Sequence, residues 1–100
     1  MEILALMKLK ESITPEDVAK HGAEEVKHTM EAYLDGKIRS FWFRSDCPGT
    51  VFMLESSDVD EAREIMNELP IVVAGIAEYD LIPLQSLKPL GTLIGRNMMG

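Results

Sequence analysis

The stretch HGAEEVKH, from His21 to His28, gathers side chains that could hold a metal ion or transfer protons. The two histidines stand seven residues apart, which is about two turns of a helix. Glu25 precedes His28 by three residues, and di-iron proteins use this spacing on the helices of a bundle. The stretch therefore raises the question of a metal site.

Helical geometry argues against that site. At about 100° per residue, the two histidines and the two glutamates fall within an arc of roughly 100°. We expect the opposite side to be the core face and the polar side to face solvent, with a contact to another subunit as the alternative. A zinc or di-iron site also needs ligands from a second element, and the chain has no third histidine. We expect no metal. The expected core face comprises Ala19, Ala23, Val26, Met30, Tyr33 and Leu34.

Two apolar stretches, 37–45 and 50–56, hold a second set of candidate residues. Pairing them as a hairpin with Ser45 opposite Thr50 places Trp42, Arg44 and Glu55 on one face. The other face then carries a core-like set of apolar residues, which comprises Phe41, Phe43, Phe52 and Leu54.

These polar groups could act on an organic acid. A carboxylate with a raised pKa can remove a proton next to a carbonyl, and an arginine can hold a substrate carboxylate by two hydrogen bonds. We expect Glu55 to be the base, Arg44 or Arg39 the clamp, and Trp42 an apolar wall. The alternative is a salt bridge at the rim of the hairpin, with Trp42 in the core.

Other residues give weaker signals. Tyr33 and Tyr79 could donate a hydrogen bond to a substrate oxygen, although such tyrosines more often sit in a core with the hydroxyl at its edge. Cys47 lies in a turn, away from the helical histidines, and we expect no nucleophilic role for it. No glycine pattern that cradles phosphate occurs, and we expect no cofactor.

Local signals define the elements that position these residues. Thr14, Pro15 and Asp17 form a helix start with a capping box, and Gly36 supplies its end. The segment DCPG has turn chemistry, and a second helix is expected to stop before Pro70. The expected elements are a strand over 2–9, a helix from 15 to about 35, strands over 37–45 and 50–56, a helix from 57 or 58 to 69, and a strand over 72–84.

This order, β-α-β-β-α-β, predicts an α+β, ferredoxin-like fold with a four-stranded antiparallel sheet and both helices on one face. The face that bears Trp42, Val51 and Met53 is too apolar to be left in water. We expect a second copy to cover it, closing a dimeric α+β barrel. Residues 1–84 form this domain, and 85–100 form an apolar arm that packs on its own or a neighbouring subunit.

Composition excludes several classes of function. The net charge of -7 disfavours binding to nucleic acid or to an anionic membrane surface. No apolar run approaches the roughly 18 residues of a membrane span, and the N-terminus lacks the features of a signal peptide. The single cysteine fits a reducing compartment, so we expect a cytoplasmic protein.

The segment AEEVKHTMEAYLDGKI, followed by Trp42 and by NELP, resembles the muconolactone isomerase group of dimeric α+β barrels. The spacing matches without a gap from Ala23 to Pro70. Two features depart from the group: the last strand is about two residues longer, and Gly22 and Val26 replace the basic residues that flank AEE. The segment RSFWFRSDCPGTVFMLES is similar to a poorly characterised bacterial branch of the superfamily.

The resemblance implies a homodimer or larger homo-oligomer and a cofactor-free isomerase that transfers a proton on a small organic acid or lactone. Two alternatives stay open. One is a cofactor-independent oxygenase of the same barrel that acts on an aromatic substrate. The other is a non-catalytic module for binding or oligomerisation.

Overall fold

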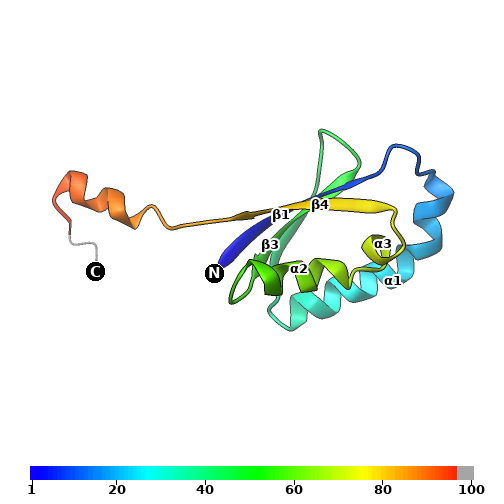
Figure 1. The fold of residues 1–100 in the computed structure, drawn as a ribbon, viewed down its shortest axis with the longest axis horizontal. Helices are drawn as coiled ribbons and strands as arrows, with labels where there is room; N and C mark the ends of the chain where they lie inside the picture. The colour runs from blue at the N-terminus through cyan, green and yellow to red at the C-terminus, as the bar shows by residue number, and fades with distance from the viewer. Residues whose placement is uncertain (97–100) are drawn as a thin grey trace.

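The computed structural model describes residues 1–96 and shows a four-stranded sheet with helices on one face (Figure 1). The strands pair antiparallel in the order β2-β3-β1-β4. This arrangement confirms the predicted α+β class and ferredoxin-like order. The elements are β1 (Glu2–Leu9), α1 (Pro15–Leu34), β2 (Ile38–Phe43), β3 (Gly49–Glu55), α2 (Val59–Asn67), α3 (Pro70–Val73), β4 (Ala77–Pro83) and the 3-10 helix η1 (Lys88–Ile94).

The predicted capping box opens α1. The Thr14 hydroxyl oxygen accepts a hydrogen bond of 3.2 Å from the Asp17 backbone N–H, and the Asp17 carboxylate accepts one of 3.0 Å from the Thr14 backbone N–H. Asp58 opens α2 by accepting a 2.8 Å hydrogen bond from the Glu61 backbone N–H. These local bonds fix where both long helices begin.

The end of the second helix differs from the prediction. Helix α2 stops at Asn67, and Pro70 starts the separate short helix α3, because proline suits the first position of a helix as well as it ends the preceding one. Gly75, at φ 74°, then leads out of α3. The last strand consequently begins at Ala77 and not at residue 72.

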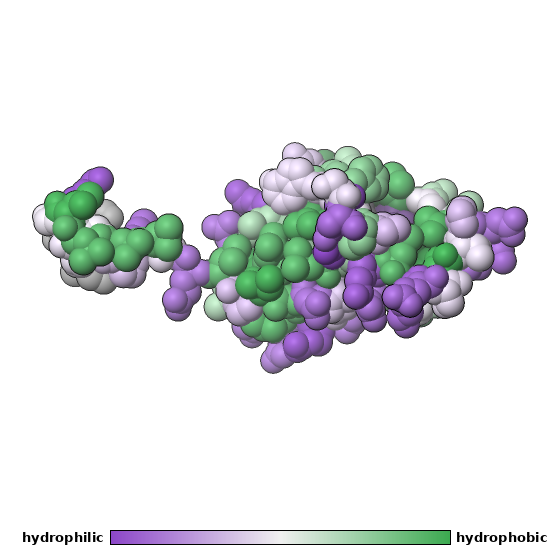
Figure 2. Space-filling view, turned by 90° about the horizontal axis from the view of Figure 1, so that it is seen from above, coloured by the Kyte–Doolittle hydropathy of each residue, from purple (hydrophilic) through white to green (hydrophobic). Residues whose placement is uncertain are grey.

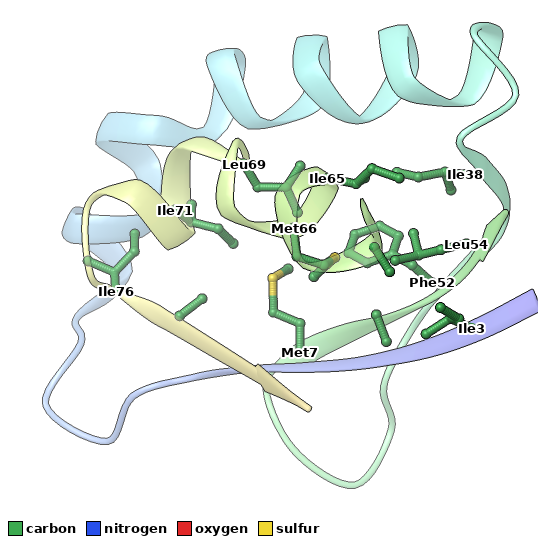
Figure 3. Packing of buried hydrophobic residues seen from close by; sticks show 13 residues of the cluster. Ile3, Met7, Ile38, Phe52, Leu54, Ile65, Met66, Leu69, Ile71 and Ile76 are labelled. Carbon is green, nitrogen blue, oxygen red and sulfur yellow. The ribbon is translucent and has the colours of Figure 1, made fainter. Parts of the chain in front are cut away.

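The hydrophobic core lies between α2, α3 and the sheet face that bears them, which we call the inner face (Figure 3). Alternate residues of β1 and β3 point into it, as the pleat of a strand requires. The buried apolar residues are Ile3, Ala5, Met7, Ile38, Phe52, Leu54, Ala62, Ile65, Met66, Leu69, Ile71, Ile76 and Ala77.

The predicted orientation of α1 is wrong. Its apolar stripe is exposed, with Val26 at 62% and Leu34 at 78% of their accessible surface, and Thr29 is the buried residue of this helix. Glu25 and His28, expected to face solvent, are half-buried. The physical reason is that α2 and α3 fill the core, so α1 packs against α3 and β2 by its Glu25–Thr29 side.

The hairpin pairs in a different register from the one expected. Phe43, and not Ser45, lies opposite Thr50, and an irregularity separates the pairs of Ile38 and Ser40. A shift of two residues leaves every side chain on the same face, because strands alternate with a period of two. The expected division of the hairpin into an inner and an outer face is therefore retained.

The C-terminal segment from residue 84 leaves the sheet and extends away from the domain (Figure 1). Leu87 and Leu93 of this arm are 76% and 79% exposed, so in this single chain the arm does not pack on its own domain. Met98 and Met99 lie outside the described residues. Among residues 1–96, no helix has the length and hydrophobicity needed to cross a membrane.

Candidate active site between helix α1 and the sheet

A cavity of about 360 Å³ opens between α1 and the part of the inner face formed by β2 and β3. This volume is within the range of about 300–1,000 Å³ typical of small-molecule sites. Helix α1 supplies one wall and the two strands supply the other. The lining residues are Glu25, Val26, Thr29, Met30, Phe41, Trp42, Phe43, Thr50 and Phe52.

The position of β2 at the edge of the sheet produces the aromatic wall. Helices α2 and α3 pack over β4 and the core residues of β1 and β3, whereas α1 is the helix that packs against β2, the strand that bears Phe41 and Phe43. The Tyr33 ring meets the Phe41 ring edge-on, with centroids 5.8 Å apart and an angle of 82°. The exposed apolar stripe of α1 therefore borders a cavity and does not enter the core.

Glu25 supplies the charged group of this cavity. Its Oε2 atom accepts a hydrogen bond of 3.3 Å from the Ile71 backbone N–H, whereas its Oε1 atom is buried and has no hydrogen-bond partner among the described residues. Burial raises the pKa of the Glu25 carboxyl above its ordinary value, although the Ile71 bond and the nearby His28 and His21 partly oppose this effect.

Two more buried polar atoms lie close to Glu25 in the fold. Thr50 Oγ1, which belongs to the same cavity, and His28 Nδ1, one helical turn after Glu25, are buried without a hydrogen-bond partner within residues 1–96. A buried polar atom left unsatisfied costs about 1–3 kcal/mol, so such atoms concentrate at sites that bind something. Two of these atoms belong to Glu25 and Thr50, which line the aromatic cavity, and they mark it as the candidate site.

The structure separates the residues that the sequence suggested as a catalytic pair. Arg44 forms two hydrogen bonds with Asp46, of 2.9 Å and 2.7 Å, at the hairpin turn. Glu55, at the far end of β3, accepts a 3.1 Å bond from the N-terminal ammonium of Met1. Both lie on the outer face, and Arg44 holds the pKa of Asp46 down at about 2.

Arg39, Glu55 and Trp42 do meet, but in a shallow outer groove of about 500 Å³. Arg44 lines a different groove, of about 300 Å³, together with Tyr79. Trp42 is the one sequence-predicted residue that also lines the inner cavity. The predicted site residues on the outer face are therefore divided between two separate grooves.

The two tyrosines have separate surroundings. Tyr33 is exposed beside the cavity mouth, through its contact with Phe41. The Tyr79 hydroxyl donates a 2.6 Å hydrogen bond to Asn67 Oδ1, which ties β4 to α2, and burial raises the pKa of this phenol. The Tyr79 hydroxyl therefore forms a structural contact between β4 and α2.

Sequence reasoning missed Glu25, Thr29 and Thr50 as site residues. One sequence signal could have indicated Glu25. The residues that follow it at successive turns on the same side of α1, Thr29 and Ala32, are small, and a helix approaches its neighbours most closely along a row of small residues. No cluster of three or more metal-ligating side chains occurs within residues 1–96.

An α+β fold of this kind, a four-stranded antiparallel sheet with helices on one face, is shared with solved structures that include a dehydrochlorinase and muconolactone isomerase. Two of the matching structures illustrate this likeness. 5-chloro-2-hydroxyhydroquinone dehydrochlorinase (TftG) of Burkholderia phenoliruptrix AC1100, in complex with 2,5-dihydroxybenzoquinone, superposes with a TM-score of 0.72 and 16% identity, over 89% of this chain and 98% of that chain. Muconolactone isomerase superposes with a TM-score of 0.70 and 15% identity, over 86% and 90%.

At such identities the likeness shows the fold, and the fold part of the resemblance seen in the sequence is thereby confirmed. The sequence itself matched no protein-family model and no curated protein.

Proposed function

We propose that this chain is a small enzyme that moves a proton on a small organic molecule bound in the inner cavity, with Glu25 as the general base. One observation carries the proposal. The Glu25 carboxylate stands at the wall of an aromatic cavity with one oxygen buried and unbonded, and burial raises its pKa. A base gains efficiency as its pKa approaches the working pH.

The two oxygens of Glu25 have different tasks in this mechanism. Oε2 stays bonded to the Ile71 N–H, which fixes the orientation of the carboxylate. Oε1 takes the proton from a C–H or O–H of the bound molecule and returns it to another atom of the same molecule, so the net reaction is an isomerisation. Thr29 and Thr50, which also line the cavity, would help to orient that molecule.

Glu55 remains the rival base, with Arg39 as the partner that could hold a carboxylate. The outer groove that contains them has a more polar composition, and Glu55 is already engaged with the N-terminal ammonium. A base needs an oxygen that is free to accept a proton. Glu25 lines the inner cavity and has one oxygen with no hydrogen bond among the described residues, which is why we place the proton transfer there.

Three variants test the assignment on a panel of lactones and enol-lactones. Glu25→Gln keeps an acceptor for the Ile71 N–H, so the fold is expected to survive, but it cannot take a proton. We expect turnover to fall by about 100-fold or more, the usual contribution of a general base. Glu24→Gln is the matched control, because it removes the same charge from an exposed neighbour on the same helix.

The third variant, Glu55→Gln, distinguishes the two assignments. If Glu55→Gln abolishes turnover and Glu25→Gln does not, the proton transfer belongs to the outer groove and our assignment is wrong. Melting temperature measured on every variant separates loss of chemistry from loss of fold. A wild-type chain that turns over no member of the panel would contradict the isomerase proposal itself.

The aromatic wall also supports a second candidate, a cofactor-independent oxygenase acting on an aromatic substrate. Phe41, Phe43 and Phe52 offer ring surfaces to such a molecule. This function predicts that oxygen is consumed when an aromatic hydroxy compound is added. An oxygen electrode distinguishes it from an isomerase, which consumes none.

We further propose that a second copy of the chain covers the outer face. Figure 2, seen from the sheet side, shows hydrophobic surface on the domain and on the arm. Trp42 is 53% and Ile82 41% exposed on this face. Burying such surface favours association in proportion to its area. Light scattering coupled to size exclusion is expected to give the mass of a dimer or larger homo-oligomer.

The assembly proposal has its own variants. Val51→Glu puts a charge in the middle of the outer face and is expected to give monomers. Removing residues 87–100 tests whether the arm adds to the assembly, because Leu87, Leu90 and Leu93 are exposed in the single chain. A monomeric wild-type chain would refute the proposal. A stable assembly with neither a cavity ligand nor turnover would favour a non-catalytic module.

We also infer a reducing compartment such as the cytoplasm. The inference is supported by Cys47, the only cysteine of the chain, which is free. Fractionation of cells that express the protein checks it, and recovery in an oxidising compartment would contradict it.

A further inference from the structure

The inner cavity presents a single charge to whatever it binds. Among the described residues that line it, Glu25 is the charged one, and the other polar residues are Thr29 and Thr50. Arg39 and Arg44, which could neutralise a bound carboxylate, belong to the grooves of the opposite sheet face. The charge of the cavity is therefore negative.

This distribution of charge determines which ligands can be accommodated. We propose that the cavity selects a neutral, planar molecule bearing a phenolic or enolic hydroxyl, whose O–H donates to the Glu25 carboxylate, and that it rejects the analogue bearing a carboxylate. This inference deepens the proposed function, since it concerns the same site. It departs from the small organic acid that the sequence resemblance implies.

The rejection of carboxylates follows from electrostatics. A ligand carboxylate next to Glu25 would bring two negative groups together in a half-buried site, where like charges repel more strongly than in water. The net charge of -7 adds a longer-range repulsion on approach. A hydroxyl, by contrast, can donate a hydrogen bond to the Glu25 carboxylate.

The preference for a planar ring follows from the walls. On the inner face, Phe43 is 91% and Phe41 is 41% exposed in the single chain, and Phe52, which also lines the cavity, is 2% exposed. A flat aromatic ligand would cover the exposed rings, which prefer stacked or edge-on contacts with other aromatic groups.

The chain carries its own reporter for this site. Trp42 is the only tryptophan, so its indole N–H gives a single resonance in a proton–nitrogen spectrum. The test compares 4-ethylphenol with 4-ethylbenzoate, two probes of similar size that differ in the hydroxyl and the carboxylate. Each is titrated into the full chain at pH 7, and affinity is taken from the shift of the Trp42 indole and from calorimetry.

We expect 4-ethylphenol to bind about 10-fold to 100-fold more tightly than 4-ethylbenzoate, the range that a hydrogen bond to a charged group supports. In Glu25→Gln the preference is expected to shrink to about two-fold, because the neutral amide does not repel a carboxylate. Glu24→Gln, which removes the same charge from the exposed side of α1, is expected to keep the wild-type preference.

The outcomes separate this inference from the proposed function. Equal binding of the two probes, or an unchanged preference in Glu25→Gln, overturns the selection of neutral ligands and leaves the role of Glu25 as a base to the turnover assay. If neither probe shifts the Trp42 indole or gives heat, the cavity is no ligand site, and both proposals are overturned.

Discussion

The Ile71 backbone N–H donates to one oxygen of Glu25, at 3.3 Å, and leaves the other oxygen of the same carboxylate buried and unbonded. This relationship joins α1 to α3 across 46 positions of sequence. It holds the carboxylate in place and leaves one oxygen without a hydrogen bond. Glu25 is therefore both a contact between α1 and α3 and the proposed base.

The raised pKa of Glu25 predicts a pH-dependent stability. Because the folded-state pKa of this carboxyl lies above its ordinary value of 4.5, the folded chain holds the proton to higher pH than the unfolded chain does. The contribution of Glu25 to stability is therefore greatest at or below pH 4.5 and is lost as the pH rises through the folded-state pKa. Urea unfolding at a series of pH values, for the wild type and Glu25→Gln, measures it. An identical pH dependence in both proteins would contradict the prediction.

His28 is predicted to tune the base. Its positive charge lowers the pKa of Glu25, so His28→Gln should raise that pKa further. The acidic limb of the pH profile of kcat/KM then moves to higher pH, with a parallel shift in the carboxyl resonance of Glu25. His28→Ala is the control for side-chain volume. Both variants remove the charge, but only alanine also removes most of the side chain, so an equal shift in the two variants is an effect of the charge. If the limb stays where it is in the wild type, His28 does not influence Glu25.

The pKa of Asp46 tests whether the Arg44–Asp46 pair at the hairpin turn forms. Its hydrogen bonds from Arg44 hold its pKa at about 2, below the ordinary value of 3.8. The stability that this pair contributes is present above pH 3.8 and is lost as the pH falls through about 2. Carbon NMR of the Asp46 carboxyl measures the pKa, which is expected to return towards 3.8 in Arg44→Gln. An ordinary pKa in the wild type would mean that the pair does not form in solution.

The order of the elements could be predicted because its signals are local. Thr14 and Asp17 bond to each other at the start of α1, three residues apart, and nothing distant decides that geometry. The faces of the hairpin were also predictable, since alternation survives a shift of two residues. The register of the hairpin could not be predicted, because it depends on an irregularity near Ser40 that no local sequence pattern indicates.

The site could not be predicted in the same way. The argument from helical periodicity assumes that the apolar side of a helix faces the core, and in α1 that side borders a cavity and solvent. This assumption predicts that Glu25 faces solvent, whereas its side chain is half-buried. Its partner Ile71 belongs to α3, a short helix that Pro70 starts where the sequence indicated only an end. Tertiary packing thus decided both the position and the surroundings of the candidate base.

The most direct test of the account compares two pKa values of Glu25. One is the pKa of its carboxyl, measured by carbon NMR, and the other is the pKa of the essential base in the pH profile of kcat/KM, measured with the same protein. We predict that the two agree, that both lie above 4.5, and that the acidic limb disappears in Glu25→Gln. An acidic limb that persists unchanged in Glu25→Gln would show that another group is the base.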